Sequence, residues 1–516
     1  MIFIKGGANL QIVERHKSKT NVEDLRSNRF YNKLNIENYH IVLSIIVAFA
    51  NISFFDNYSA SLLFVLIELC ILFYFLIKKN ITDYLGHYLI FLSLSIEFEE
   101  LVGKTFYGFK NFRILGVNLG IMTLIPILLL IFVKPVRIKT IKTKFPHYYK
   151  FAIMMFFLNF IGVFFGLFQI LVNDNNIQNM DNYILHFINE LYTMIALPML
   201  VIFAIGYILT WELNKIYKLK SYLISILVGV VASMVFSLVS GNYGTYSVDT
   251  LLVTNVIRYI PFMLIIPFYK NYKLPKYFVV VALLSMVLSL FYNATGKQIL
   301  LNMLIPLGII SIFWRQKKYL SFGLLMLAFP VIGIIASLLV DMFIDRSILF
   351  EIKFNQAISM IKFWENNWLI NMPLSPRIRI IELMNISLEY IKKPWFVLFG
   401  KGYMGSITDH SGLLGNTFIL GSFSMEQWNN GTFYRVHETF NKLYLYHGIV
   451  GIGFYIYTIK LVFKNFTKSP WILVGGFWIL MVYGYSVTMT AYGMVALLLG
   501  FIELDTSSKR INKELY

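Results

Sequence analysis

Apolar blocks of membrane length recur along almost the whole chain. Each spans roughly 16 to 25 residues, the length that a helix needs to cross a hydrocarbon core of about 30 Å. The run LIPILLLIFV within one of them contains no charged residue. We count about 14 such blocks. They lie at about 40–55, 60–77, 84–98, 114–133, 151–172, 191–211, 222–240, 250–269, 277–292, 298–314, 319–343, 443–463, 470–485 and 487–503.

Composition supports this interpretation of the blocks. Hydrophobic residues make up 58% of the 516 residues and charged residues 14%. Soluble globular domains average about half apolar and about a quarter charged residues. The sequence therefore predicts an all-α polytopic membrane protein with about 14 transmembrane helices and one large, outward-facing, partly helical loop.

Basic residues gather in every second connection between the blocks. Because short cytoplasmic loops are enriched in Lys and Arg, this alternation predicts that both chain ends are cytoplasmic. The net charge of +18 is then explained by orientation in the membrane, and we expect no nucleic-acid partner. The predicted organisation is a cytoplasmic extension (1–39), transmembrane helices 1–11 (40–343), a large extracytoplasmic loop (344–442), helices 12–14 (443–503) and a cytoplasmic tail (504–516).

The long loop is where we expect the chemistry, since loops on a rigid scaffold carry function more often than the scaffold does. Apolar spacing predicts one helix over 348–364. A second is predicted to begin at Ser375-Pro376, a favourable cap and first-turn pair, and to end near Lys393. Arg377 and Arg379 fall in its first turn, where free backbone amides also favour an anion.

Several cations are candidates for holding a diphosphate, since arginine matches phosphate oxygens with paired hydrogen bonds. In the loop these are Arg377, Arg379 and Arg435; solvated loop cations are the alternative. Arg258 lies inside an apolar block, where a structural ion pair with Glu68 is the alternative to a phosphate contact. The turn GKGYMGS (400–406) could also bring its backbone to a phosphate, or serve only as a turn.

His437 and Glu438 stand just before the block that opens at about 443. Histidine is the usual general base near neutral pH, so the pair is the candidate for accepting a proton from a substrate hydroxyl. A structural histidine is the alternative. No HExxH or Cys/His spacing is present, and we expect no metal.

Four aromatic residues of the loop could stack on sugar rings, with interfacial anchoring as the alternative. They are Trp395, Tyr403, Trp428 and Tyr434.

The order of these motifs resembles the O-antigen polymerase and O-antigen ligase superfamily. The matching parts are ATGKQ (294–298), Arg377 and Arg379, Pro394-Trp395 followed by Gly400 and Gly402, and His437 followed by Leu443, Tyr444 and Gly448. Two positions depart from the family pattern. The residue after the histidine is commonly asparagine and is Glu438 here, and the usual arginine of the first turn is Lys297. Whether His437 or Glu438 is the base therefore stays open.

The resemblance implies an integral-membrane, metal-independent glycosyltransferase without a cofactor. Its substrate would be an undecaprenyl-diphosphate-linked oligosaccharide, and the active site would face the periplasm or exterior of a bacterial cytoplasmic membrane. Diphosphate contacts fall to Arg377, Arg379, Arg435, Arg258 and Lys297. Membrane lipid and a chain-length regulator protein are the further candidate partners. Polymerase is the favoured function, ligase the nearest alternative, and a lipid-linked oligosaccharide flippase the alternative from another class.

Overall fold

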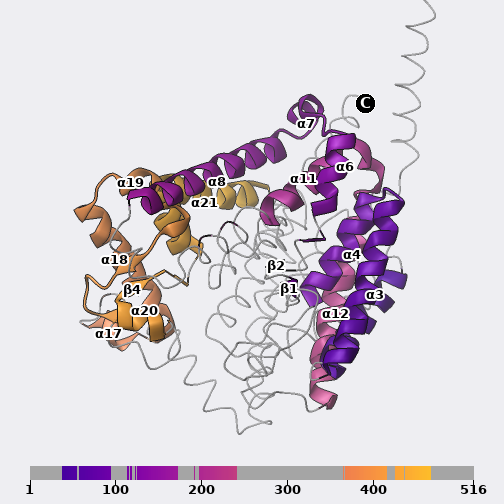
Figure 1. Ribbon diagram of the computed structural model, residues 1–516, viewed down its shortest axis with the longest axis horizontal. Helices are drawn as coiled ribbons and strands as arrows, with labels where there is room; N and C mark the ends of the chain where they lie inside the picture. The colour runs from indigo at the N-terminus through magenta and orange to yellow at the C-terminus, as the bar shows by residue number, and fades with distance from the viewer. Residues whose placement is uncertain are drawn as a thin grey trace, which may run out of the picture.

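The computed structural model describes residues 38–54, 57–94, 113–114, 117–118, 122–123, 125–172, 187, 191, 197–240, 364, 367–372, 374–414, 423, 425–434, 436–437 and 439–465. Most of these residues are helical, as the sequence predicted. Two short antiparallel strand pairs complete the described secondary structure. Figure 1 shows the helices in two groups, with α8 extending from one to the other.

The first group is a helical bundle from the N-terminal half of the chain. Its members are α2 (Asn38–Ser53), α3 (Tyr58–Ile77), α4 (Ile81–Leu94) and α12 (Lys218–Ser240). Asn57 caps α3, because its side chain accepts a hydrogen bond from the backbone N–H of Ala60 at 3.0 Å. The first amides of α4 donate instead to the Glu212 carboxylate, which comes from a different part of the chain. Both devices satisfy amides that a helix leaves unpaired at its start.

In the chain, shorter elements stand between α4 and α8 and between α8 and α12. They are α6 (Ile125–Val133), α7 (Ile138–Lys144), α11 (Leu197–Trp211) and the 3-10 turn η4 (Leu213–Lys215). The strands β1 (Arg113–Ile114) and β2 (Val117–Asn118) pair antiparallel, with Ile114 opposite Val117. The predicted apolar span at 114–133 is therefore wrong at its start, because 113–114 and 117–118 form a strand pair. Gly116, which stands between the two strands in the sequence, is a residue type that favours a tight turn over helix.

The second group belongs to the long polar loop and the helix that follows it. It contains α17 (Trp368–Asn371), α18 (Leu374–Lys392), α19 (Phe396–Phe399), η6 (Gly402–Met404), β3 (Ile407–Thr408), α20 (Met425–Asn430), β4 (Thr432–Phe433) and α21 (Thr439–Asn465). The strands pair antiparallel, with Ile407 opposite Phe433. The predicted helix from Ser375 to about Lys393 is confirmed as α18. The predicted helix 348–364 lies outside the described residues, apart from Trp364.

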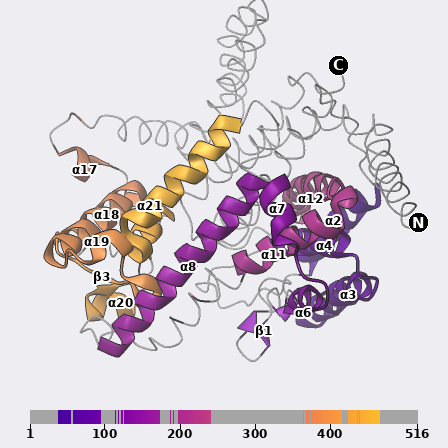
Figure 2. The ribbon, with the colours of Figure 1, turned by 90° about the horizontal axis from the view of Figure 1, so that it is seen from above.

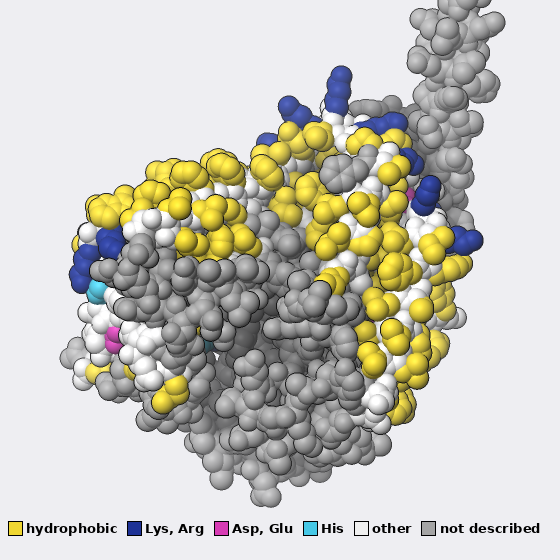
Figure 3. Space-filling view, in the orientation of Figure 1, with side chains coloured by type: hydrophobic (Ala, Val, Ile, Leu, Met, Phe, Trp, Pro, Cys, Tyr) yellow, Lys and Arg dark blue, Asp and Glu magenta, His cyan; other side chains and the backbone are white. Residues whose placement is uncertain are grey.

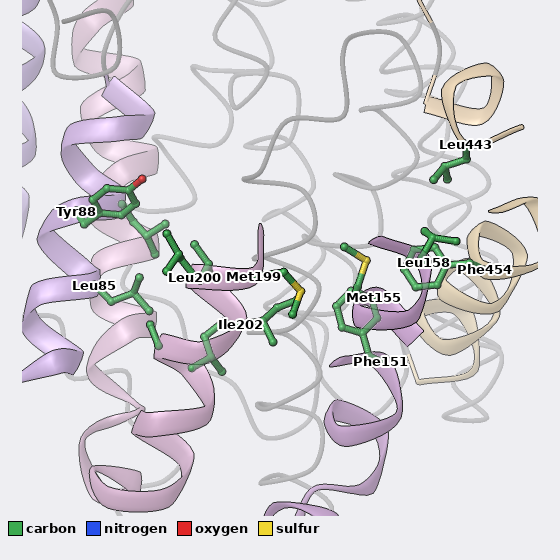
Figure 4. Close-up of a cluster of buried hydrophobic side chains, with 14 of the residues drawn as sticks. Leu85, Tyr88, Phe151, Met155, Leu158, Met199, Leu200, Ile202, Leu443 and Phe454 are labelled. Atoms are coloured by element: carbon green, nitrogen blue, oxygen red, sulfur yellow. The ribbon is translucent and has the colours of Figure 1, made fainter. Parts of the chain in front are cut away.

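Two long helices, α8 (Pro146–Val172) and α21, pack side by side in opposite directions (Figure 2). The rings of Phe151 and Phe454 lie 5.7 Å apart near one end. Nearer the other end, Gly162 faces the His447 side chain. Phe151, Met155 and Leu158 of α8 belong to the buried core, together with Leu443 and Phe454 of α21 (Figure 4).

The outer side of α8 is apolar and exposed. Phe156, Phe160, Phe164 and Leu171 are among its exposed side chains, and hydrophobic side chains cover this part of the molecule in Figure 3. Within the described part of the chain, α8 is the helix that is both long and apolar enough to cross a membrane. Several shorter apolar helices coincide with predicted spans, including α2 and α11. The predicted number of about 14 spans stays a prediction, because the spans at 250–343 and 470–503 lie outside the described residues.

Candidate functional site

Helix α18 forms the centre of the candidate site. Three polar side chains on it are buried: Glu382 and Asn385 are 0% exposed, and Glu389 is 3% exposed. Their spacing of three and then four residues puts them on one face of the helix. Buried carboxylates are rare unless they are paired or hydrogen-bonded. Each of the three residues therefore points to a specific partner from the surrounding loop.

Glu382 binds the segment that carries His437. The Nδ1 atom of His437 lies 2.5 Å from Oε1 of Glu382. The backbone N–H of His437 donates to both carboxylate oxygens, at 3.2 and 3.1 Å. Asn441, one turn into α21, donates from Nδ2 to Oε2 at 3.0 Å. One carboxylate thus fixes both the backbone and the ring of the histidine.

This geometry determines which nitrogen of His437 carries the proton. A carboxylate can only accept hydrogen bonds, so Nδ1 of His437 is the donor and the neutral ring keeps its lone pair on Nε2. The His437 side chain is 26% exposed whereas that of Glu382 is 0% exposed. A substrate hydroxyl can therefore approach the ring, and Glu382 can stabilise the imidazolium that forms when Nε2 takes a proton.

Arg379 lies one helical turn before Glu382 on α18 and is half-buried. Residues three apart on a helix are neighbours on its surface. The Arg379 carbonyl also accepts a hydrogen bond from Asn441 Nδ2 at 2.8 Å, which ties this turn of α18 to the start of α21. The diphosphate-binding role of Arg379 stays a prediction.

Arg377 has a different position. Its Nε and Nη2 atoms donate to the Met372 carbonyl at 3.1 and 2.7 Å, so the guanidinium folds back over the start of α18. Nη1 takes no part in this pair of bonds. Its diphosphate-binding role stays a prediction.

Glu389 forms a second pairing, two turns further along α18. The Lys401 ammonium forms an ion pair with its Oε1 atom, and the two side chains are 0% and 4% exposed. The Lys401 ammonium also donates to the Ser406 carbonyl at 2.6 Å. His410 Nε2 lies 3.8 Å from Oε2 of Glu389. Lys401 is thus a structural cation rather than a free one.

The glycine-rich turn 400–406 packs against α8. Gly402 has φ of +70° and lies against the backbone of Gly162 and Gly166, so a side chain at 402 would collide with main-chain atoms. The Tyr403 hydroxyl donates to Asn159 Oδ1 at 2.6 Å. Gln169 donates to the Lys401 carbonyl. The turn therefore joins the loop to α8, and its buried backbone faces helix rather than a ligand.

The four aromatic candidates lie in unlike environments. Trp395 is 62% exposed, and Trp428 is partly exposed with its ring 5.5 Å from that of Phe433. Tyr434 is buried, and its N–H donates to Gln427 Oε1 at 3.0 Å. Tyr403 is buried against α8, so in this structure its ring faces are covered by protein. Glycan stacking stays a prediction for the two tryptophans, and for the tyrosines it would need a rearrangement.

Four of the predicted site residues lie outside the described residues. They are Arg435, Glu438, Arg258 and Lys297. Their roles stay predictions, and so does the alternative pairing of Arg258 with Glu68, which is itself buried in α3. Among the residues that are described, no group of three or more metal-ligating side chains comes together.

Sequence reasoning missed Glu382 and Asn441, the two residues that position His437. The signal was present in the predicted helix, where Glu382, Asn385 and Glu389 recur at helical spacing. A polar stripe on an otherwise apolar helix predicts buried partners, although it does not show which ones.

Comparison with models of known protein families gives no match, and comparison with curated protein sequences gives no significant match. The candidate site is therefore interpreted from its own geometry.

Proposed function

We propose that the chain is a membrane-embedded glycosyltransferase of the polysaccharide-polymerase type. It would transfer a glycan from a polyprenyl diphosphate to a hydroxyl of a second lipid-linked repeat unit. The observation that carries the proposal is the pairing of buried Glu382 with partly exposed His437. This pairing leaves a proton-accepting Nε2 next to the turn that carries Arg379.

The proposed step divides between these groups. The acceptor hydroxyl oxygen forms a bond to the anomeric carbon of the donor sugar, and its proton passes to Nε2 of His437. The bond from that carbon to the diphosphate oxygen breaks, and the diphosphate leaves with the electron pair. Arg379 is the described cation best placed to stabilise the departing charge, since preorganised charges act strongly where water is excluded.

The arrangement of α8 and α21 supports a location at a membrane. At about 1.5 Å per residue the 27 residues of α8 extend about 40 Å. Basic residues, Lys142, Lys144 and Lys150, lie at or before its start, and Lys460 and Lys464 lie at the matching end of antiparallel α21. The Glu382–His437 pair lies beside the other end of these helices. This polarity agrees with basic residues on the cytoplasmic side and a site on the outer side.

The test is transfer by the purified full-length protein in lipid. A polyprenyl-diphosphate repeat unit should give a ladder of longer products, and His437→Ala should lower the rate by about 10²- to 10⁴-fold, the usual contribution of a general base. Lys393→Gln, on the same loop but outside the pair, is the matched control. Transfer of a single glycan to a different acceptor would favour a ligase, and full activity of a folded His437→Ala protein would remove the assignment of the base.

A further inference from the structure

A basic surface precedes α8 at the end remote from His437. It consists of α7 and the residues that lead into it, and we name it the α7 surface. All five of its cationic side chains are exposed: Lys134, Arg137, Lys139, Lys142 and Lys144. The sequence from 134 to 150 contains no Asp or Glu. Figure 3 shows Lys and Arg side chains gathered over α7, next to the apolar surface of α8.

Apolar groups are exposed within the same surface. Val133 is 81% exposed and Ile138 is 63% exposed. Ile141 of α7 is buried, belongs to the hydrophobic core and fixes the helix to the rest of the protein. A surface that served only to bind a soluble anion would not need two large exposed aliphatic side chains between its cations.

Trp211 adds an aromatic component. The Lys134 ammonium and the Arg137 guanidinium lie 4.3 and 4.2 Å from its ring centroid. Its indole N–H donates to the Pro135 carbonyl at 3.2 Å. Tryptophan with neighbouring Lys and Arg is typical of the boundary between hydrocarbon and water, where the ring meets acyl chains and the cations meet phosphate.

We infer that the α7 surface binds anionic phospholipid headgroups. The cations would contact lipid phosphates, Val133 and Ile138 would enter the acyl region, and the exposed phenyl rings of α8 would continue the apolar contact. A cluster of four to eight basic residues beside a membrane helix is the pattern that attracts anionic lipid. This inference is independent of glycan transfer, because it concerns the opposite end of α8 and needs no catalytic residue.

The experiment uses the purified full-length protein in an uncharged detergent. Its melting temperature is followed while phosphatidylglycerol, or phosphatidylcholine with the same acyl chains, is added. We expect phosphatidylglycerol, and not phosphatidylcholine, to raise the melting temperature of the protein. Lys139→Gln with Lys142→Gln should weaken the apparent affinity for phosphatidylglycerol about 30-fold, because each cation near an anionic lipid surface contributes about fivefold to that affinity. Both side chains are exposed, so the fold itself should tolerate the change.

Two further variants separate this inference from a general charge effect. Lys392→Gln with Lys393→Gln removes the same charge at the other end of the molecule and should leave the affinity unchanged. Ile138→Asn should weaken binding while keeping every cation. The inference is overturned if phosphatidylcholine stabilises equally, or if the two lysine pairs have equal effects. It is also overturned if glycerophosphoglycerol, which has the headgroup charge without acyl chains, raises the melting temperature as much as phosphatidylglycerol does.

Discussion

Helix α18 presents two glutamates seven residues apart, and each lies beside a histidine. Glu382 accepts three kinds of N–H donor from the 437–441 segment, and the side chain of its histidine partner is partly exposed. Glu389 instead is bound by the buried Lys401 ammonium. The same residue type on the same helix face thus has two kinds of partner: one carboxylate fixes a partly exposed histidine, and the other neutralises a buried cation.

The histidines beside these two glutamates, His437 and His410, also differ in which ring nitrogen carries the proton. Lys392 Nζ lies 3.0 Å from His410 Nδ1, and an ammonium can only donate, so the Nδ1 lone pair of His410 is already occupied. The Nε2 atom of His410 then carries the proton and lies 2.8 Å from Thr408 Oγ1. Burial lowers the pKa of His410, Glu389 opposes this shift and Lys392 adds to it. His410 therefore has no lone pair to offer a substrate.

The largest expected effect is on activity. Glu382→Gln should lower the transfer rate by about 10²- to 10⁴-fold, because an amide cannot stabilise the imidazolium and can donate to Nδ1, which selects the wrong tautomer. Initial rates of ladder formation, with circular dichroism to verify folding, measure this. A folded Glu382→Gln protein with the wild-type rate would show that the contact to His437 is structural only.

Glu389→Gln should act mainly on stability. It leaves the Lys401 ammonium buried without its counter-charge, which costs about 3–5 kcal/mol when one partner of a buried pair is removed. The double variant Glu389→Leu, Lys401→Met removes both charges and should recover most of that loss. Denaturation in detergent provides the measurement. A double variant no more stable than Glu389→Gln would argue against the ion pair as the cause.

Tyr403→Phe addresses the link between the loop and α8. The change removes the hydrogen bond to buried Asn159 and should cost about 1–3 kcal/mol, with the KM for the lipid-linked substrate unchanged. A raised KM at normal stability would restore Tyr403 as a glycan contact.

The smallest expected effect is a pH dependence from His410. Its pKa in the folded protein lies below the ordinary value of about 6.5 for the unfolded chain. Between those two values the unfolded state binds more protons, so stability rises with pH and is lost as pH falls below about 6.5. His410→Gln should flatten this part of the stability profile. An unchanged slope would place the titrating group elsewhere.

The elements of the loop were more predictable than its contacts. Ser375-Pro376 marked the start of α18, and the predicted end near Lys393 was close to the observed Lys392, because caps and prolines act locally. The pairing of Glu382 with His437 joins positions 55 residues apart in the sequence. Periodicity shows which face of a helix is buried, but the partner of that face depends on how β3, β4 and α21 bring the chain back.

The glycine-rich turn was predictable as a tight turn, but the groups that it packs against were not. GKGYMGS predicts tight backbone geometry, which the structure contains at Gly400 and Gly402. Gly400 lies against the α21 backbone at Tyr446–Gly448, and Gly402 lies against two glycines of α8. Glycine permits close approach to any group, so its presence alone does not distinguish a helix from a ligand.

The backbone conformation of Gly448 determines how α21 is directed relative to α18. Its φ of +58° and ψ of −145° interrupt α21 one residue after His447, and its α-carbon lies against the Val397 and Leu398 carbonyls. The part of α21 before the break stays with α18, while the part after it runs along α8. A single residue without a side chain therefore sets the angle between the segment that follows His437 and the helix that packs along α8.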